Sequence, residues 1–269
     1  MRERSRLMGT VIRILGRPAT TSLVLPLVFL TLAAAPLSAA MSVGITSCGQ
    51  EIASRKTGVL LADLSHCLFA VTLLQHARLD LNGHSISGEP NSDLIICSRS
   101  CEVNGPGTIS DANEGIVAGI GEVRNYTVKG VLTVRDLTMR NLQSALSASA
   151  GIKASNLLIT HGGRAFAAQR VQAADITITD SLPGETIGDG RMRFRRLVLT
   201  GSSTLGVSAT ALRLVDSYVM GDIGGYPGFD LVASQRPKLI RSTCGRSARW
   251  NRVGLAVGTW GVCVHDPRP

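Results

Sequence analysis

Short runs of alternating apolar and polar residues, each ended by a turn, recur from residue 79 towards the C-terminus. In the first run, LDLNGHSISG at residues 79–88, apolar side chains alternate with polar ones, which is the period of a β-strand. Asn82-Gly83 interrupts the run, and both residues tolerate the left-handed backbone conformation of tight turns. The pattern therefore predicts a strand, a sharp turn and a second strand.

The same strand pattern returns at a nearly constant interval along the chain. Its key apolar positions are separated by steps of 20, 19, 21 and 21 residues, at Leu137, Leu157, Ile176, Leu197 and Tyr218. A period near twenty admits leucine-rich repeats and the parallel β-helix, but the L-x-x-L-x-L-x-x-N frame of the former is absent. Three short strands and three turns account for such a coil. The sequence thus predicts an all-β, single-stranded right-handed parallel β-helix, in which Thr160, Thr179 and Thr200 form one stacked ladder.

Four segments follow from composition and charge. Residues 1–40 resemble a signal peptide, because five arginines precede the apolar run Leu23–Ala35 and small residues precede Met41. An uncleaved anchor is the alternative; after cleavage we expect no membrane span. We then expect an N-terminal cap at 41–77, the β-helix at 78–243 and a C-terminal cap or tail at 244–269. Aromatic residues make up only 4% of the chain, which suits a narrow, repetitive interior.

The expected mature chain is basic and contains every cysteine. Removing five Arg and one Glu leaves 23 basic and 18 acidic side chains, a net charge of about +5 that favours anionic partners. An even number of cysteines in an exported chain predicts disulfides. They fall in sequential pairs, Cys48 and Cys67, Cys97 and Cys101, and Cys244 and Cys263. Sequential pairing is the simplest connectivity, but the sequence does not fix it. We expect no zinc at Cys97 and Cys101, since no second pair completes a tetrahedral set.

The N-terminal third resembles a known group of proteins. Cys48-Gly49, the strand Leu60–Leu64, Cys67 and the segment Leu79–Gly88 occur in the order found at the entry of secreted bacterial right-handed β-helix proteins of the pectin-lyase-like superfamily. Gly105–Ile109 is similar to the next coil of that group. The resemblance implies the fold, export to the cell surface, the periplasm or the medium, and a Cys48–Cys67 bridge. It implies no particular activity.

Arg191-Met192-Arg193-Phe194-Arg195 is the clearest candidate binding strand. Alternation directs Met192 and Phe194 inward and the three arginines outward, where their guanidinium groups could hold carboxylates, sulfates or phosphates. Arg170 or Arg213 would flank them on adjacent coils. A solvated surface strand whose charges protect an edge is the alternative.

Candidates for catalysis and metal binding are weaker. His161 and Arg164 follow a strand and form a candidate acid–base pair, although a histidine alone in a loop is commonly inert. Asp175, Asp180 and Asp189 are candidate calcium ligands, but they are spread over more than one turn. Asp80, Asn82 and His84 could also bind calcium, and we favour a role in capping turns. The active-site motifs of polygalacturonases and mannuronan epimerases are absent, and so are a phosphate loop and the spacing of a catalytic triad.

Two hypotheses for the function follow. The first is a secreted or surface β-helix that binds an extracellular polysaccharide or another anionic polymer on its basic strand, without catalysis and without a cofactor. The second is a polysaccharide lyase or related carbohydrate-active enzyme with a divergent site, for which Ca²⁺ would be the cofactor. Compact coils after residue 137 favour binding, so enzymatic activity stays undecided. We expect no nucleic acid as partner and no membrane span after signal cleavage, and the sequence does not predict an oligomeric state.

Overall fold

The structure is a computed structural model in which residues 42–119, 129–180, 190–200 and 211–218 are described with their side chains. It also describes residues 122–123, 126–127, 184–187, 205–209, 219, 229–233, 238–244, 249–251 and 258–259, most of them by their backbone alone. Every secondary-structure element within these residues is a β-strand. No helix long and apolar enough to cross a membrane occurs in them.

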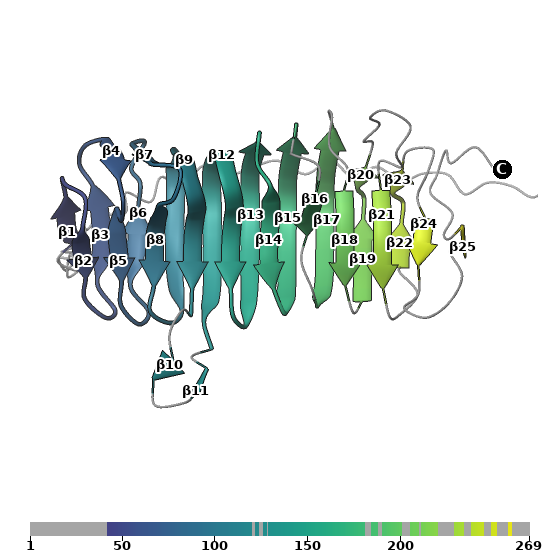
Figure 1. The fold of residues 1–269 in the computed structure, drawn as a ribbon, viewed down its shortest axis with the longest axis horizontal. Coiled ribbons are helices and arrows are strands. Elements are labelled where there is room, and N and C mark those ends of the chain that lie inside the picture. Colours follow the sequence, from purple (N-terminus) through teal and green to yellow (C-terminus); the bar gives the residue numbers. More distant parts are fainter. Residues whose placement is uncertain are drawn as a thin grey trace, which may run out of the picture. The chain divides into compact units, whose positions relative to one another are not determined.

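The strands stack into three parallel faces joined by tight corners (Figure 1). The first face holds β1 (Ser42–Ile45), β3 (Thr57–Leu60), β6 (Arg78–Asp80), the first parts of β9 (Cys101–Ala118), β12 (Val131–Ala148), β13 (Gly151–Thr160), β15 (Arg170–Thr179) and β17 (Arg191–Thr200), then β19 (Ala211–Val215) and β22 (Lys238–Ile240). The second face holds β4 (Leu64–Cys67), β7 (Ser85–Gly88), the middle parts of β9 and β12, the last parts of β13, β15 and β17, then β20 (Tyr218–Val219) and β23 (Thr243–Cys244).

The third face holds β2 (Gln50–Ile52), β5 (Val71–Leu73), β8 (Asp93–Cys97), the last parts of β9 and β12, β14 (Arg164–Ala168), β16 (Gly184–Ile187), β18 (Leu205–Ala209), β21 (Phe229–Ala233) and β24 (Arg249–Asn251). Three strands pair antiparallel instead: β10 (Glu122–Val123) with β11 (Tyr126–Thr127), and β25 (Gly258–Thr259) with β24. The predicted parallel β-helix is confirmed.

Stacked apolar ladders fill the interior between the faces. Leu157, Ile176 and Leu197 are successive partners on the second face, and each is at most 2% exposed. Phe194 packs edge-on against Phe166, with 5.6 Å between ring centroids. Because each coil repeats the inward phase of the last, the apolar side chains form a continuous dry core, which is the dominant stabilising term. The predicted threonine ladder at 160, 179 and 200 is also present.

Polar residues in the left-handed conformation make the corners. Asp136, Asn156, Asp175, Arg196, Asp216 and Arg241 have positive φ between the first and second faces, and Asp111, Asn141, His161 and Asp180 do so between the second and third. Asn82 (φ 50°) and Gly83 (φ 85°) make the turn predicted from the sequence. Asp80 accepts a hydrogen bond from the amide of Asn82 there (2.9 Å), so its carboxylate stabilises the turn.

Two details differ from the sequence-based prediction. Ser217, and not Tyr218, continues the inward ladder of Leu197, because Val198 pairs with Tyr218 and Tyr218 is exposed. Ser217 is buried and satisfies its hydroxyl by accepting from the amide of Leu197 (3.2 Å) and donating to the carbonyl of Val215 (2.9 Å). The parallel ladders also begin earlier than residue 78, since β1 to β5 pair with later coils.

Candidate functional site: a basic strand face

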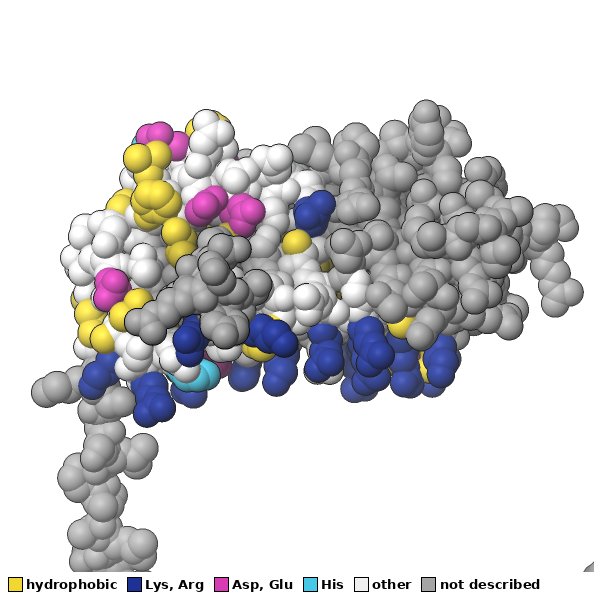
Figure 2. Space-filling model, turned by 60° about the horizontal axis from the view of Figure 1, so that its bottom comes forward, with side chains coloured by type: hydrophobic (Ala, Val, Ile, Leu, Met, Phe, Trp, Pro, Cys, Tyr) yellow, Lys and Arg dark blue, Asp and Glu magenta, His cyan; other side chains and the backbone are white. Residues whose placement is uncertain are grey.

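Exposed cations gather on the outer side of the first face. The register places Lys153, Gln172, Arg193, Arg213 and Lys238 in one ladder over five successive coils. Arg170 pairs with Arg191 beside it, and Arg195 lies two residues further along β17. All of these side chains are exposed, while Met192 and Phe194 are buried, as predicted from alternation. Figure 2 shows the row of Lys and Arg side chains along one edge of the solenoid.

Acidic partners neutralise some cations and leave others unpaired. Glu102 contacts both Arg78 (3.2 Å) and Arg135 (3.6 Å), so two cations on the earlier coils of this face share one carboxylate. Among the residues described here, no acidic side chain forms an ion pair with the later cations, which are Lys153, Arg170, Arg191, Arg193, Arg195, Arg213 and Lys238. The four steps from Lys153 to Lys238 span roughly 19 Å at about 4.8 Å per strand.

A shallow groove of about 390 Å³ lies among these cations. Ala174 forms part of its floor. It is the register partner of Arg195 on β17, and its small methyl group leaves space beside that long side chain. Arg193, Arg195 and Arg213 form its walls together with Gln172. The groove therefore offers three guanidinium groups around a small apolar floor, which is suited to an anionic group on a flat backbone.

The corner beside the groove holds two arginine–aspartate pairs. Arg196 donates to both carboxylate oxygens of Asp175, and Arg241 donates to those of Asp216 from Nε (2.6 Å) and Nη2 (2.8 Å). These hydrogen bonds, with a smaller contribution from nearby positive charge including Arg195, lower the pKa of Asp175 and of Asp216. Both carboxylates are therefore ionised at neutral pH, and they occupy the guanidinium groups of the corner.

The proposed acid–base pair is split between two hollows. His161 is exposed at a corner with φ 50° and lines a hollow of about 630 Å³ with Asp111, Asn141 and Gln143. Arg164 lines a second hollow of about 340 Å³, and Gln143 is common to the lining of both. Gly163 permits this arrangement, because a Cβ at that position would lie 2.5 Å from the Gln143 carbonyl oxygen. His161 and Arg164 thus do not line a common hollow.

The candidate calcium ligands are not brought together. Asp175 pairs with Arg196 at the corner between the first and second faces, whereas Asp180 lies at the next corner, beyond the second-face part of β15. Asp189 lies outside the described residues. Within the described part of the chain, no group of three His, Cys, Asp or Glu side chains could hold a metal ion.

Asp80, Asn82 and His84 have structural partners. Asn82 donates from its side chain to the Leu60 carbonyl (3.3 Å), and His84 lies 3.3 Å from Asp63. Asp63 also accepts from the amide of Ser85 (2.8 Å), and this bond is the main cause of its lowered pKa. These contacts tie the turn to the coil before it, in agreement with the capping role.

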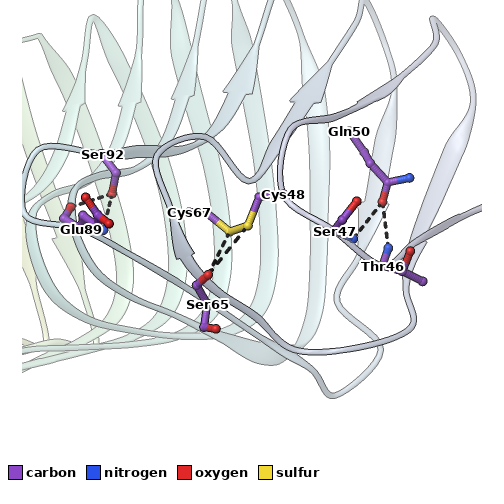
Figure 3. Close-up of a disulfide and its surroundings, with 8 residues drawn as sticks. All are labelled: Thr46, Ser47, Cys48, Gln50, Ser65, Cys67, Glu89 and Ser92. Atoms are coloured by element: carbon purple, nitrogen blue, oxygen red, sulfur yellow. Dashed lines mark hydrogen bonds between the residues drawn. A yellow bond between two sulfur atoms is a disulfide. The ribbon is translucent and has the colours of Figure 1, made fainter.

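Two of the three predicted disulfides are present. Cys48–Cys67 joins the turn after β1 to the end of β4, with the Ser65 carbonyl oxygen 3.9 Å from each sulfur (Figure 3). Cys97–Cys101 closes the corner between β8 and β9. Cys244 is in β23, and its expected partner Cys263 lies outside the described residues. The described cysteine side chains are all bonded, which is consistent with an oxidising compartment.

Lys153, Lys238 and the acidic cluster around Glu114 were missed by the sequence-based search. The two lysines are single charges in otherwise mixed strands, so only the register over successive coils reveals the ladder. Asp93, Glu114, Ser144 and Arg164 are likewise dispersed in sequence but lie in register on the third face. Aligning every coil at this position would have found them.

Comparisons with known proteins do not assign the chain to a family. The chain matches no protein-family model, no curated protein and no solved structure. The function is therefore inferred from the residues and their geometry.

Proposed function

We propose that this protein is a secreted or cell-surface right-handed β-helix of the pectin-lyase-like type that binds a linear anionic polymer, such as an acidic polysaccharide, along its basic first face. The observation that supports this proposal is the run of cations from Lys153 to Lys238, which have no ion-pair partner among the described residues, with the Arg193–Arg195–Arg213 groove at its centre. Charges repeated at each coil match a ligand that carries negative groups at intervals along its length.

Multiple weak contacts would supply the affinity. An exposed ion pair contributes about 0–1 kcal/mol, so a single arginine would hold a monomeric anion poorly. Several pairs formed together by one polymer add through their high effective concentration. Binding should therefore increase with polymer length and weaken as salt screens the charges.

The test replaces Arg191, Arg193 and Arg195 together by Gln and measures retention on an acidic-polysaccharide column at low ionic strength. We expect the variant to elute at much lower salt than the unchanged protein, with the same melting temperature, because the three side chains are exposed. A control variant with Arg55, Arg99 and Arg140 changed to Gln removes the same charge away from the groove and should still be retained. Equal retention of both variants would refute the proposal.

The same preparation also tests the enzymatic alternative. Incubation with a panel of polyuronates, with and without Ca²⁺, should release no shortened or unsaturated products if the face only binds. Product formation that survives the triple Gln change would assign catalysis to another face of the solenoid.

A further inference from the structure

The hollow of about 630 Å³ lies at the corner between the second and third faces, and it shares no lining residue with the basic groove. Its volume is in the range of pockets that bind small molecules. None of the described residues that line it is a lysine or an arginine. The hollow therefore suits a different kind of ligand from the one proposed for the groove.

The floor of this hollow is apolar. Ala112 and Leu142 are register partners on successive coils, and they are only 5% and 2% exposed. Gly88 adds no side chain at the corner, where a Cβ would lie 2.1 Å from the Ser92 hydroxyl oxygen. Small or buried residues thus leave open space above a surface of carbon atoms, which favours a ligand with an apolar face.

Polar side chains stand around this apolar floor. Asp111, Asn141 and His161 occupy the same corner in three successive coils, and all have positive φ (59°, 53° and 50°). The Ser110 hydroxyl donates to one carboxylate oxygen of Asp111 (2.6 Å), and the Asn141 amide donates to the other (2.8 Å). These two bonds lower the pKa of Asp111, so its carboxylate is ionised at neutral pH. An ionised carboxylate has about four acceptor sites, so Asp111 can still accept from a ligand.

Two further side chains at the hollow have unused hydrogen-bonding capacity. Gln143 and His161 are exposed, and their side chains form no hydrogen bond or ion pair within the part of the chain that the structure describes. The Gln143 amide both donates and accepts, and so does a neutral imidazole. Asp111, Asn141, Gln143 and His161 form the polar rim of the hollow. From Asp111 to His161 the rim spans two steps between coils, about 10 Å.

We propose that this hollow binds a neutral sugar ring, with the C–H face of the ring on the apolar floor and its hydroxyl groups on the polar rim. A sugar hydroxyl both donates and accepts, so it matches a rim that combines a carboxylate with groups that do both. The C–H groups of the ring match the floor of Ala112 and Leu142. The proposal does not rest on the polymer assigned to the first face, because it uses none of the cations of that face.

Charged ligands fit the hollow less well. An acidic sugar would meet the ionised Asp111, and Arg140, whose charge also lowers the pKa of Asp111, does not line the hollow. A metal ion would find one carboxylate and one imidazole among the described lining residues, which is fewer than the usual set of ligands. A neutral polyhydroxyl ligand has neither difficulty.

NMR titration with the methyl glycosides of glucose, galactose and mannose tests the proposal. The imidazole resonances of His161 are assigned by their absence from His161→Asn, since Asn tolerates the left-handed conformation of this corner. We expect at least one glycoside to shift these resonances, while those of His66 and His76 on earlier coils stay in place. The uronic acid form of the same glycoside should bind about fivefold or more weakly, because its carboxylate meets Asp111.

Gln143→Ala should weaken the glycoside that binds by about fivefold, the loss that one hydrogen bond produces. The melting temperature should not change, because the Gln143 side chain is exposed. Gln172→Ala removes the same amide from the first face and should leave the affinity unchanged. Absence of binding by all three glycosides, equal or tighter binding of the uronic acid form, or an unchanged affinity in Gln143→Ala would each overturn the proposal.

The variant with Arg191, Arg193 and Arg195 changed to Gln separates this site from the basic groove. The glycoside should bind this variant as it binds the unchanged protein, whether or not the acidic-polysaccharide column retains it. Loss of glycoside binding in the variant would place the sugar in the groove and would overturn the proposal for the hollow.

Discussion

Arg196 and Asp175, on successive coils, form a two-point ion pair at the corner beside the basic groove. Both residues have positive φ (54° and 58°), so each occupies a corner position and projects away from the core. Arg195, the residue before Arg196, instead lies on the first face and lines the groove. Two adjacent arginines therefore have different roles: one is neutralised by the corner and the other is available to a ligand.

Asp175→Asn should strengthen polyanion binding. The change releases the guanidinium of Arg196 next to the groove, and Asn tolerates the left-handed conformation that this position requires. We expect the variant to elute from an acidic-polysaccharide column at higher salt than the unchanged protein.

Asp136→Asn is the matched control for this experiment. Asp136 occupies the same corner ladder with φ 58°, but its partner is Asn156, which donates to it at 2.7 Å. The control changes net charge by the same amount and releases no guanidinium. If both variants shift elution equally, net charge alone explains retention and Arg196 has no specific part.

Leu197→Asp should unfold the β-helix. Leu197 is fully buried and stacked on Ile176, so the change places an unpaired charge in a dry core. Val198→Asp, one residue on and pointing to the other side of the strand, should be tolerated far better. Thermal melts followed by circular dichroism compare the two, and a soluble Leu197→Asp protein with an unchanged melting temperature would contradict the assigned phase.

Periodicity predicted the fold because every coil of the solenoid needs the same alternation of inward apolar and outward polar side chains. Each coil must present apolar side chains inward with a period of two, so Met192, Phe194 and Leu197 could be placed from their neighbours in sequence alone. Tyr218 was misplaced because it is the first apolar residue of its strand, whereas Ser217 holds the inward position with its hydroxyl bonded to the Leu197 amide and the Val215 carbonyl. A local polar bond of this kind leaves no trace in a hydrophobic pattern.

The site was predictable only in part for a related reason. Three arginines on β17 are visible as a local alternation, but their partners Lys153, Arg213 and Lys238 are recognised only through inter-coil register. Loop insertions change the step between coils, as between Glu114 and Ser144. Asp175 pairs with Arg196 and does not join the other candidate calcium ligands. This pairing depends on side-chain geometry at a corner, which the sequence pattern does not specify.

The two observed disulfides should differ in their contribution to stability. In the chain-entropy model, Cys48–Cys67 closes a loop of about twenty residues and contributes on the order of 3 kcal/mol, and the short Cys97–Cys101 loop contributes about 2 kcal/mol. Double changes to Ser at each pair, compared by urea denaturation, should therefore destabilise the protein more at Cys48 and Cys67. Free thiols at these two positions in non-reducing mass mapping would contradict the assigned pairing.

Glu114 and Asp111 should have opposite effects on the pH dependence of stability. Folding raises the pKa of Glu114, mainly through burial, so the folded state retains its proton to higher pH and stability falls as pH rises through that range. Folding lowers the pKa of Asp111, mainly through its hydrogen bond with Ser110 (2.6 Å) and then Asn141 (2.8 Å). The contribution of Asp111 is present above its unfolded pKa and is lost on acidification.

Replacing each carboxyl group by an amide tests the direction of both effects on the pH dependence of stability. Glu114→Gln should gain melting temperature relative to the unchanged protein as the pH is raised above about 4.5, its ordinary pKa, and lose that gain below it. Asp111→Asn should be less stable at neutral pH, with the difference disappearing as acid protonates Asp111 in the unchanged protein. Melting curves between pH 3 and 8 measure both differences. A Glu114→Gln protein whose stability relative to the unchanged chain does not vary with pH would show that this carboxyl is not held in its protonated form by folding.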